Sequence, residues 1–296
     1  MVDSTKSHPD LAPRSERMKR IMISLVATLS ALYLAVVGLM YVAQRSLQYF
    51  PQEGLRTGFE VPARYGLDGF GAASIDTSDG ETLVSWLALP PATGAPVILY
   101  MHGNAGTFGD RAERFRLFRD EGFGVLALSW RGYGGSTGSP TEEGLVEDGR
   151  AALKLLEQKG IPLSRIILFG ESLGTGVATQ LAANPATSPL AVILEAPYTS
   201  AADVVRKHYW FLPIGLLMKD QFRSIDFASR VTAPVFVFHG TADTIVPYEQ
   251  GKRLYATFNA PKDFLTMKGN GHIDPLSPAS WGAIKAFLKA NGAVPK

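Results

Sequence analysis

The sequence of 296 residues predicts an α/β fold with a mostly parallel sheet, preceded by one membrane-spanning helix. Over most of the chain, short apolar runs without polar alternation are separated by helix-like stretches, as in a parallel sheet that is covered on both faces. A separate run of 23 residues, 21–43, carries no charge. The 46% apolar content is enough for one large core, and with 30 glycines and 19 prolines it excludes disordered, collagen-like and coiled-coil proteins.

The uncharged run 21–43 predicts a membrane anchor, because a helix of this length reaches across a hydrocarbon core of about 30 Å. Lys and Arg are more frequent before this run than after it, which places the N-terminus in the cytoplasm. We therefore expect a cytoplasmic basic tail over 1–20, a transmembrane anchor over 21–43 and one domain over 44–296. That domain lies on the non-cytoplasmic side, which is the periplasm in a bacterium.

Two other interpretations of the run 21–43 remain open. A cleaved signal peptide has a shorter apolar region, and the residues before Gln44 form a poor cleavage site. A buried core helix is rarely so long and so uniformly uncharged.

Charge and cysteine content exclude several classes of function. The first 46 residues contain six Lys or Arg and three Asp or Glu, whereas the rest contains 23 and 24, so we expect no nucleic-acid partner. The absence of cysteine excludes disulfides, thiolate zinc sites and a cysteine nucleophile. Phosphate-binding glycine motifs and clustered metal ligands are also missing, so we expect neither a cofactor nor a metal.

The domain opens with an antiparallel pair, since strand-like runs at 68–75 and 81–89 flank an Asp-Gly turn signal. Residues 44–66 are expected to connect the anchor to this pair. Apolar runs predict parallel strands at 97–101, 125–129, 165–169, 191–194, 235–238 and 264–267. Helices are expected at 111–120, 141–159, 172–183 and 281–290.

A candidate nucleophile lies in the sequence GESLG, residues 170–174, between a predicted strand and a predicted helix. A sharp turn at this point leaves no room for side chains at the two glycines and pushes the Ser172 hydroxyl out of the sheet. The same pattern occurs in GGSTG, residues 134–138, but Ser136 is in a loop and Pro140 follows soon after. We therefore predict that Ser172 is the nucleophile.

A serine nucleophile needs a base, and the base needs an orienting acid. His272 lies in a glycine-rich loop after the last predicted strand, and Asp243 follows the strand before it. The chain order Ser172, Asp243, His272 is the order that this strand-turn-helix arrangement requires. Glu195, at the end of another predicted strand, is the alternative acid.

Acyl transfer also needs hydrogen-bond donors for the oxyanion. We predict that the main-chain amide of Leu173, directly after the nucleophile, is one donor. The second is the main-chain amide of Asn104 in HGNAG, residues 102–106, with Ala105 as the alternative.

These motifs together resemble the α/β-hydrolase superfamily, and most closely its single-pass, N-terminally anchored serine hydrolases. The resemblance rests on YFP (49–51), HGN (102–104), WRGYGGS (130–136), GESLG (170–174), DTIVP (243–247) and GH (271–272). It implies an α/β-hydrolase fold over 44–296, a triad of Ser172, Asp243 and His272, and an oxyanion hole of Asn104 and Leu173.

That resemblance also implies hydrolysis of a carboxylic ester or thioester of a small or lipid-like acyl substrate, through an acyl-enzyme intermediate. A peptidase-like hydrolase, a non-hydrolytic enzyme on the same fold and an inactive scaffold are the alternatives.

The segment between Glu195 and Val235 is too short for a large lid domain, but it contains ten consecutive uncharged residues, 209–218. This stretch is too short to span a bilayer. It predicts either a helix that packs in the core or an apolar wall for an acyl chain near the membrane.

Overall fold

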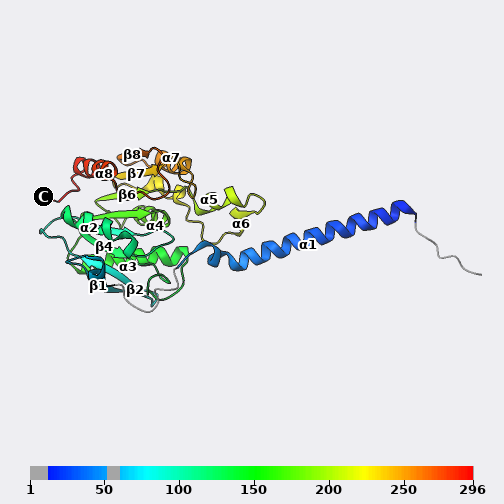
Figure 1. Cartoon of the computed structure of the whole chain (residues 1–296), viewed down its shortest axis with the longest axis horizontal. Helices are drawn as coiled ribbons and strands as arrows, with labels where there is room; N and C mark the ends of the chain where they lie inside the picture. Colours follow the sequence, from blue (N-terminus) through cyan, green and yellow to red (C-terminus); the bar gives the residue numbers. More distant parts are fainter. Residues whose placement is uncertain (1–12, 52–60, 296) are drawn as a thin grey trace, which may run out of the picture. The chain divides into compact units, whose positions relative to one another are not determined.

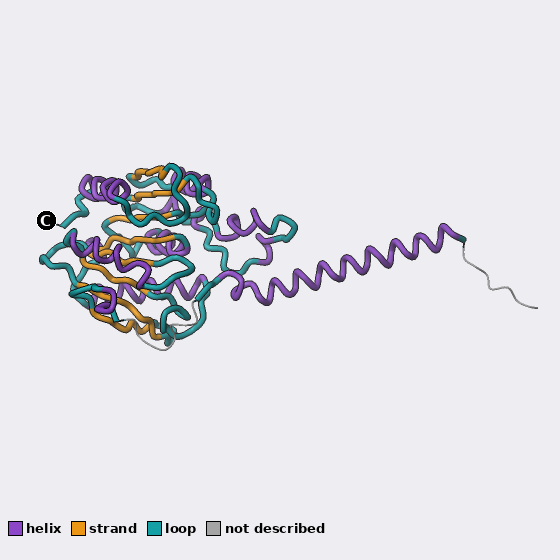
Figure 2. Tube along the Cα trace, in the orientation of Figure 1, coloured by secondary structure: helices purple, strands orange, loops and turns teal. Residues whose placement is uncertain are grey.

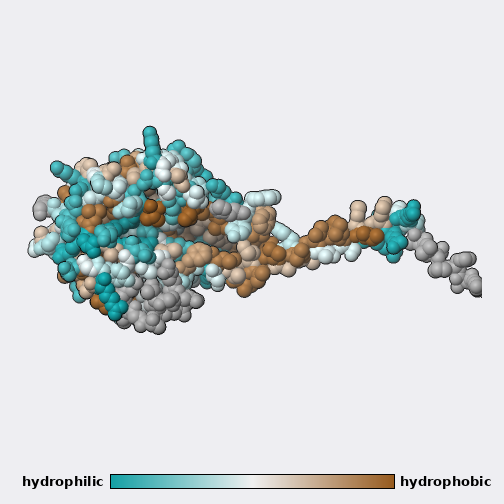
Figure 3. Space-filling view, in the orientation of Figure 1, coloured by the Kyte–Doolittle hydropathy of each residue, from teal (hydrophilic) through white to brown (hydrophobic). Residues whose placement is uncertain are grey.

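The computed structural model describes residues 13–51 and 61–295. Two compact units divide between Gln44 and Arg45. The first contains most of α1 (Arg14–Gln48), a helix that is long and apolar enough to cross a membrane by length and composition. Figure 3 shows α1 brown along its apolar length and teal at its basic N-terminal end.

The second unit is built on one mixed sheet. Among the described residues, eight strands pair in the order β1-β2-β4-β3-β5-β6-β7-β8 (Figures 1 and 2). The strands β1 (Gly71–Asp76) and β2 (Thr82–Ala88) are antiparallel, and β2 pairs antiparallel with β4. The parallel strands are β3 (Val97–Met101), β4 (Gly124–Leu128), β5 (Ile166–Glu171), β6 (Ala191–Glu195), β7 (Val235–Gly240) and β8 (Lys262–Met267). This arrangement confirms the predicted fold class, including the antiparallel N-terminal edge.

Helices cover both faces of the sheet because successive strand side chains point to opposite faces. In β3, Leu99 packs in one apolar cluster and Tyr100 in another. The first cluster contains side chains from α3 (Glu142–Gln158), α4 (Leu173–Ala182) and α7 (Tyr248–Thr257). The second contains side chains from α2 (Ala112–Asp120) and α8 (Pro278–Ala290). The strands therefore lie between two helical layers, and their carboxyl ends lead into loops at one edge.

The uncharged stretch 209–218 follows α5 (Ala201–His208) and does not form a core helix. Only α6 (Ile214–Leu217) within it is helical, and only Leu212 and Ile214 are buried. Trp210 is 80% exposed and Leu216 is 88% exposed. The interpretation as a core-packing helix is therefore wrong, and the acyl-chain wall stays a prediction.

Candidate active site

Three loops at the carboxyl ends of the parallel strands bring Ser172, Asp243 and His272 together. The Ser172 Oγ lies 2.8 Å from His272 Nε2, and His272 Nδ1 lies 2.7 Å from Asp243 Oδ2. Ser172 follows β5, Asp243 follows β7, and His272 follows β8. With the proton on Nδ1, His272 donates to the carboxylate and accepts from the serine hydroxyl, which is the geometry of a general base.

The turn at Ser172 is strained and closely packed. Its φ of 48° is rare for a residue with a side chain. A Cβ on Gly170 would lie 2.7 Å from the Gly174 carbonyl oxygen, and one on Gly174 would overlap the carbonyl oxygen of Met101. Both positions therefore require glycine, as expected for a turn that exposes the nucleophile.

The Asp243 carboxylate is fixed by four hydrogen bonds. Oδ1 accepts from the main-chain amides of Ile245 (2.8 Å) and Val246 (2.9 Å), and Oδ2 accepts from His272 and from His239 Nε2 (3.0 Å). Burial alone would raise the pKa of Asp243, but the hydrogen bonds from His239 and His272 outweigh it and hold this pKa below its usual range. Asp243 is therefore an ionised partner for His272.

His239 is a residue that the sequence did not single out for this site. Its Nε2 also lies 3.0 Å from the Val246 carbonyl oxygen, which can only accept, so Nε2 carries the proton. Its Nδ1 is buried and has no hydrogen-bond partner among the described residues. His239 thus acts on Asp243 as a fixed donor.

The loops that carry Asp243 and His272 touch each other and the sheet. A Cβ on Gly240 would overlap the carbonyl oxygen of Gly271. Glu195, the alternative acid, accepts from the Asp274 amide at 2.8 Å and from Arg114 Nη1 at 2.5 Å. Its hydrogen bonds therefore position the loop that follows His272, and none of them reaches His272 itself.

The predicted oxyanion donors lie on two other elements. Leu173 is the first residue of α4, where a main-chain amide lacks a partner within the helix. In the described part of the chain, no hydrogen bond leaves the main-chain amides of Leu173 and Asn104. Both are available to an oxyanion, and so is that of the alternative, Ala105.

The Asn104 side chain fastens its loop to residues 48–50, at and just after the C-terminal end of α1. Its Nδ2 donates to the Gln48 carbonyl oxygen at 2.6 Å, and its Oδ1 accepts from the Tyr133 hydroxyl at 2.8 Å. The Phe50 amide lies 3.2 Å from the same hydroxyl oxygen. The sequence predicted no role for these side-chain contacts, which hold the loop 102–106 near Ser172.

A buried ion pair joins that loop to the serine turn. Arg111 binds the Glu171 carboxylate, and Glu171 Oε1 accepts from the Gly103 amide at 3.2 Å. Burial alone would raise the pKa of Glu171, but the charges of Arg111 and Arg114 and the hydrogen bonds from Arg111 and Tyr100 together outweigh burial and lower it. Since a buried ion pair costs much to break, Glu171 holds Ser172 and Gly103 in fixed positions.

His102, in the same loop, is buried and stays neutral. Burial and the nearby charge of Arg111 lower its pKa from 6.5 to about 3. Its Nδ1 donates to the Gly103 carbonyl oxygen, so Nε2 is free to accept from the Trp130 amide.

Ser136, in the second GxSxG sequence, has a structural role instead. Its hydroxyl is buried, accepts from the Val84 amide at 2.9 Å and donates to the Ser129 carbonyl oxygen at 3.0 Å. No group of three or more His, Asp or Glu side chains suited to a metal ion occurs within residues 13–51 and 61–295.

Comparison with known proteins gives one family match. The family model described as "alpha/beta hydrolase fold" matches residues 96–215. The uncharacterized protein Rv2307c of Mycobacterium tuberculosis is 37% identical over 256 residues, covering 86% of this chain and 89% of that protein. Protein bem46 of Schizosaccharomyces pombe is 33% identical, covering 91% and 92%.

Two further matches have activities in their names. The lysophosphatidylserine lipase ABHD12 of Danio rerio is 32% identical, and the match covers 78% of this chain and 61% of the lipase. The solved Pyrococcus furiosus esterase Pf2001 superposes with a TM-score of 0.64 at 21% identity, covering 79% of this chain and 96% of the esterase. The structural match shows a shared fold.

Proposed function

Because this chain belongs to the α/β-hydrolase superfamily, we propose that it is a membrane-anchored serine hydrolase that cleaves carboxylic ester or thioester bonds. The hydrogen-bonded series Ser172, His272, Asp243 is the observation that carries this proposal. A hydroxyl is a weak nucleophile by itself, and an oriented imidazole at hydrogen-bond distance activates it.

The proposed reaction has two steps. His272 Nε2 takes the Ser172 proton as the hydroxyl oxygen attacks the carbonyl carbon of the substrate, and the carbonyl oxygen becomes an oxyanion held by the Leu173 and Asn104 amides. The bond to the leaving group then breaks, and His272 returns the proton to it. Water, deprotonated by the same imidazole, attacks the acyl-enzyme and releases the acid.

Asp243 has a supporting part in both steps. Its ionised carboxylate keeps the His272 proton on Nδ1 and stabilises the imidazolium that forms when the serine proton is taken. The hydrogen bonds from Ile245, Val246 and His239 keep that carboxylate in one orientation.

A lipid-like acyl substrate is the favoured class. The similarity to a lysophosphatidylserine lipase and an apolar helix that could hold the enzyme at a bilayer support it. We expect the hydrolysis rate to hold or rise as the acyl chain of an ester series lengthens from acetyl to octanoyl. A steady fall along that series would contradict the lipid-like class and leave the hydrolase proposal intact.

The proposal is tested with a fluorophosphonate probe on the detergent-solubilised full chain, followed by intact mass. We expect one adduct on the wild type, none on Ser172→Ala, and one on the control Ser136→Ala, whose hydroxyl has a structural role. Turnover of an ester should fall by several powers of ten in Ser172→Ala. A folded wild type without an adduct would instead support an inactive scaffold, and adducts together with peptide cleavage alone would support a peptidase.

The proposed topology places residues 1–20 in the cytoplasm and the domain from 44 to 296 on the other side. Because the chain has no cysteine, single variants such as Ser7→Cys and Lys159→Cys give unambiguous labelling sites. We expect an impermeant maleimide to reach Lys159→Cys from the non-cytoplasmic side and Ser7→Cys only after the membrane is opened. The reverse pattern would invert the topology.

A further inference from the structure

Large apolar side chains are exposed together on one short segment, residues 209–218, called here the apolar loop. Tyr209 is 41% exposed, Trp210 80%, Phe211 49% and Leu216 88%. Single exposed apolar residues are common, but a group of them on a solvent-exposed surface marks an interaction site.

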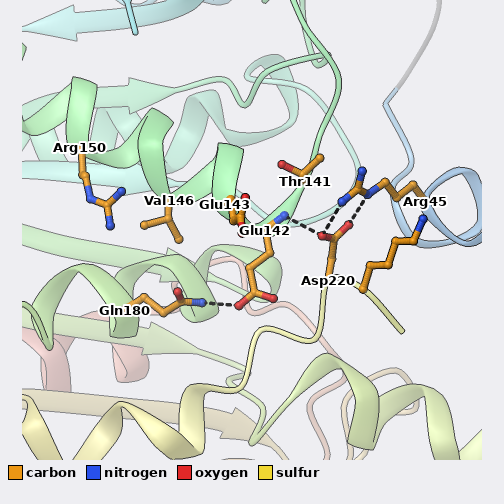
Figure 4. A pocket seen from close by; sticks show the side chains of 9 residues that line it. Arg45, Thr141, Glu142, Glu143, Val146, Arg150, Gln180 and Asp220 are labelled. Carbon is orange, nitrogen blue, oxygen red and sulfur yellow. Dashed lines mark hydrogen bonds and ion pairs between the residues drawn. The ribbon is translucent and has the colours of Figure 1, made fainter. Parts of the chain in front are cut away.

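An ion pair joins Asp220, just after the apolar loop, to Arg45, two residues after the predicted anchor. Arg45 Nε lies 2.8 Å from Asp220 Oδ2, and Arg45 Nη2 lies 3.1 Å from Oδ1. Figure 4 shows this pair with the Glu142 amide also directed at the Asp220 carboxylate, 3.2 Å from Oδ1. Gln48 Nε2 donates to the Asp220 carbonyl oxygen at 2.8 Å. Since the Asp220 side chain is only 5% exposed, this ion pair is part of the packed structure.

Chain connectivity then limits how far the apolar loop can lie from the bilayer. Arg45 comes two residues after the uncharged run ends at Ala43, which is about 3 Å along a helix. Asp220 comes two residues after the apolar loop ends at Met218. The headgroup region adds about 5–8 Å to each side of the hydrocarbon core. If 21–43 spans the membrane, the base of the apolar loop lies at headgroup depth.

The composition of the apolar loop and its flanks fits a lipid surface. Trp and Tyr prefer the boundary between headgroups and acyl chains, and leucine adds apolar area. Exposed basic side chains flank the loop on both sides, at Arg206, which also pairs with Asp203, and Lys207 before it and at Lys219 after it, a composition that favours an anionic lipid surface.

We propose that the apolar loop is a second membrane contact, in which Trp210 and Leu216 insert into the surface of the same bilayer that holds the N-terminal helix. This inference rests on the proposed anchoring of residues 21–43. The two contacts would fix the orientation of the catalytic domain on the membrane, because one anchor alone leaves a domain free to rotate.

Tryptophan fluorescence provides the test. All four tryptophans are described, and Trp86, Trp130 and Trp281 are buried, so the difference between wild type and Trp210→Phe isolates the exposed one. The full chain is reconstituted into phosphatidylcholine vesicles containing a lipid that is brominated near the top of its acyl chains. We expect the brominated lipid to quench most of the Trp210 signal and aqueous iodide to quench little of it.

A matched control uses Leu89→Trp in the Trp210→Phe background. Leu89 is 50% exposed and follows β2, whose last residue pairs with the start of β4, at the edge of the sheet opposite the active site. A tryptophan there should be quenched by iodide and not by the brominated lipid.

Three other outcomes would overturn the inference, each in a distinct way. Quenching of Trp210 by iodide and not by lipid would place the apolar loop in water. Protection from both quenchers that is lost on dilution of the protein among vesicles would show that a second copy covers it. If the chain does not float with the vesicles, the proposed membrane anchor is wrong as well. The fluorophosphonate adduct on Ser172 would still test the hydrolase proposal independently.

Discussion

The loops that carry Asp243 and His272 directly follow β7 and β8, whereas the apolar loop follows α5, and the two regions are held very differently. In the loops of the predicted triad, the Asp243 carboxylate accepts four hydrogen bonds, and Gly240 allows close contact with Gly271. Within the apolar loop, Leu212 and Ile214 are buried and residues 217–218 are half-buried, whereas its other large side chains are exposed. The apolar composition of a segment therefore does not determine whether it is tightly packed. Its contacts with distant parts of the chain determine that.

The largest effect is expected where the serine turn packs most closely. A Cβ in Gly174→Ala would overlap the Met101 carbonyl oxygen, so we expect a loss of about 3 kcal/mol or more in unfolding free energy and loss of probe labelling. The control Gly282→Ala lies in α8 with open space around it and should gain about 0.5–1 kcal/mol. Urea unfolding in detergent measures both. Normal stability of Gly174→Ala would mean that the turn can relax.

The buried and the exposed leucines of the apolar loop can be compared directly. Leu212→Ala removes a buried side chain and should cost about 3 kcal/mol, whereas Leu216→Ala removes an exposed one and should change stability by less than about 0.5 kcal/mol. The same urea unfolding, in detergent without lipid, distinguishes them. Equal losses of unfolding free energy in the two variants would show that Leu216 is packed as tightly as Leu212 in the folded protein.

In the loop that carries the predicted oxyanion donor Asn104, His102 should make the free energy of unfolding depend on pH. Folded His102 stays neutral down to about pH 3, whereas the unfolded chain binds a proton below its ordinary pKa of 6.5. Acid therefore favours unfolding, and the contribution of His102 to stability falls by about 1.4 kcal/mol per pH unit between these two values. We expect His102→Asn to flatten the pH dependence of the unfolding free energy between about pH 7 and about pH 5. Parallel curves for variant and wild type would assign the acid sensitivity to other groups.

The smallest effect is expected at His239, which donates to Asp243 without touching Ser172. We expect His239→Phe to slow probe labelling about tenfold, since a charge-assisted hydrogen bond of about 1.5 kcal/mol is lost. The pKa of Asp243 should rise with it. His239→Gln keeps a donor and should recover part of the rate; a rate unchanged in both variants would leave His239 with a packing role only.

Much of the fold could be predicted because the parallel strands are short, uniformly apolar runs bounded by loops. The run 97–101, for example, matches β3 at both ends. The elbow at Ser172 was predictable because the close packing around it requires glycine at positions 170 and 174, which leaves a recognisable local pattern in the sequence. The exposure of residues 209–218 was not, since the same apolar composition suits a core helix. The hydrogen bonds of Asn104 to Gln48 and of Glu195 to Asp274 were not predictable either, because they join residues 56 and 79 positions apart and leave no local pattern.

The contacts of Gln48 with Asn104 and of Arg45 with Asp220 make residues 45–50 the first piece of the globular unit instead of a spacer. This limits how the enzyme could be shed from a membrane by proteolysis. A cut before Arg45 would release a domain that keeps every one of these contacts. A cut after Phe50 would remove the acceptor of the Asn104 side chain and free the loop that carries the predicted oxyanion donor. A released form that is still active should therefore retain Gln48, and one that begins at or before Arg45 also keeps the ion pair with Asp220.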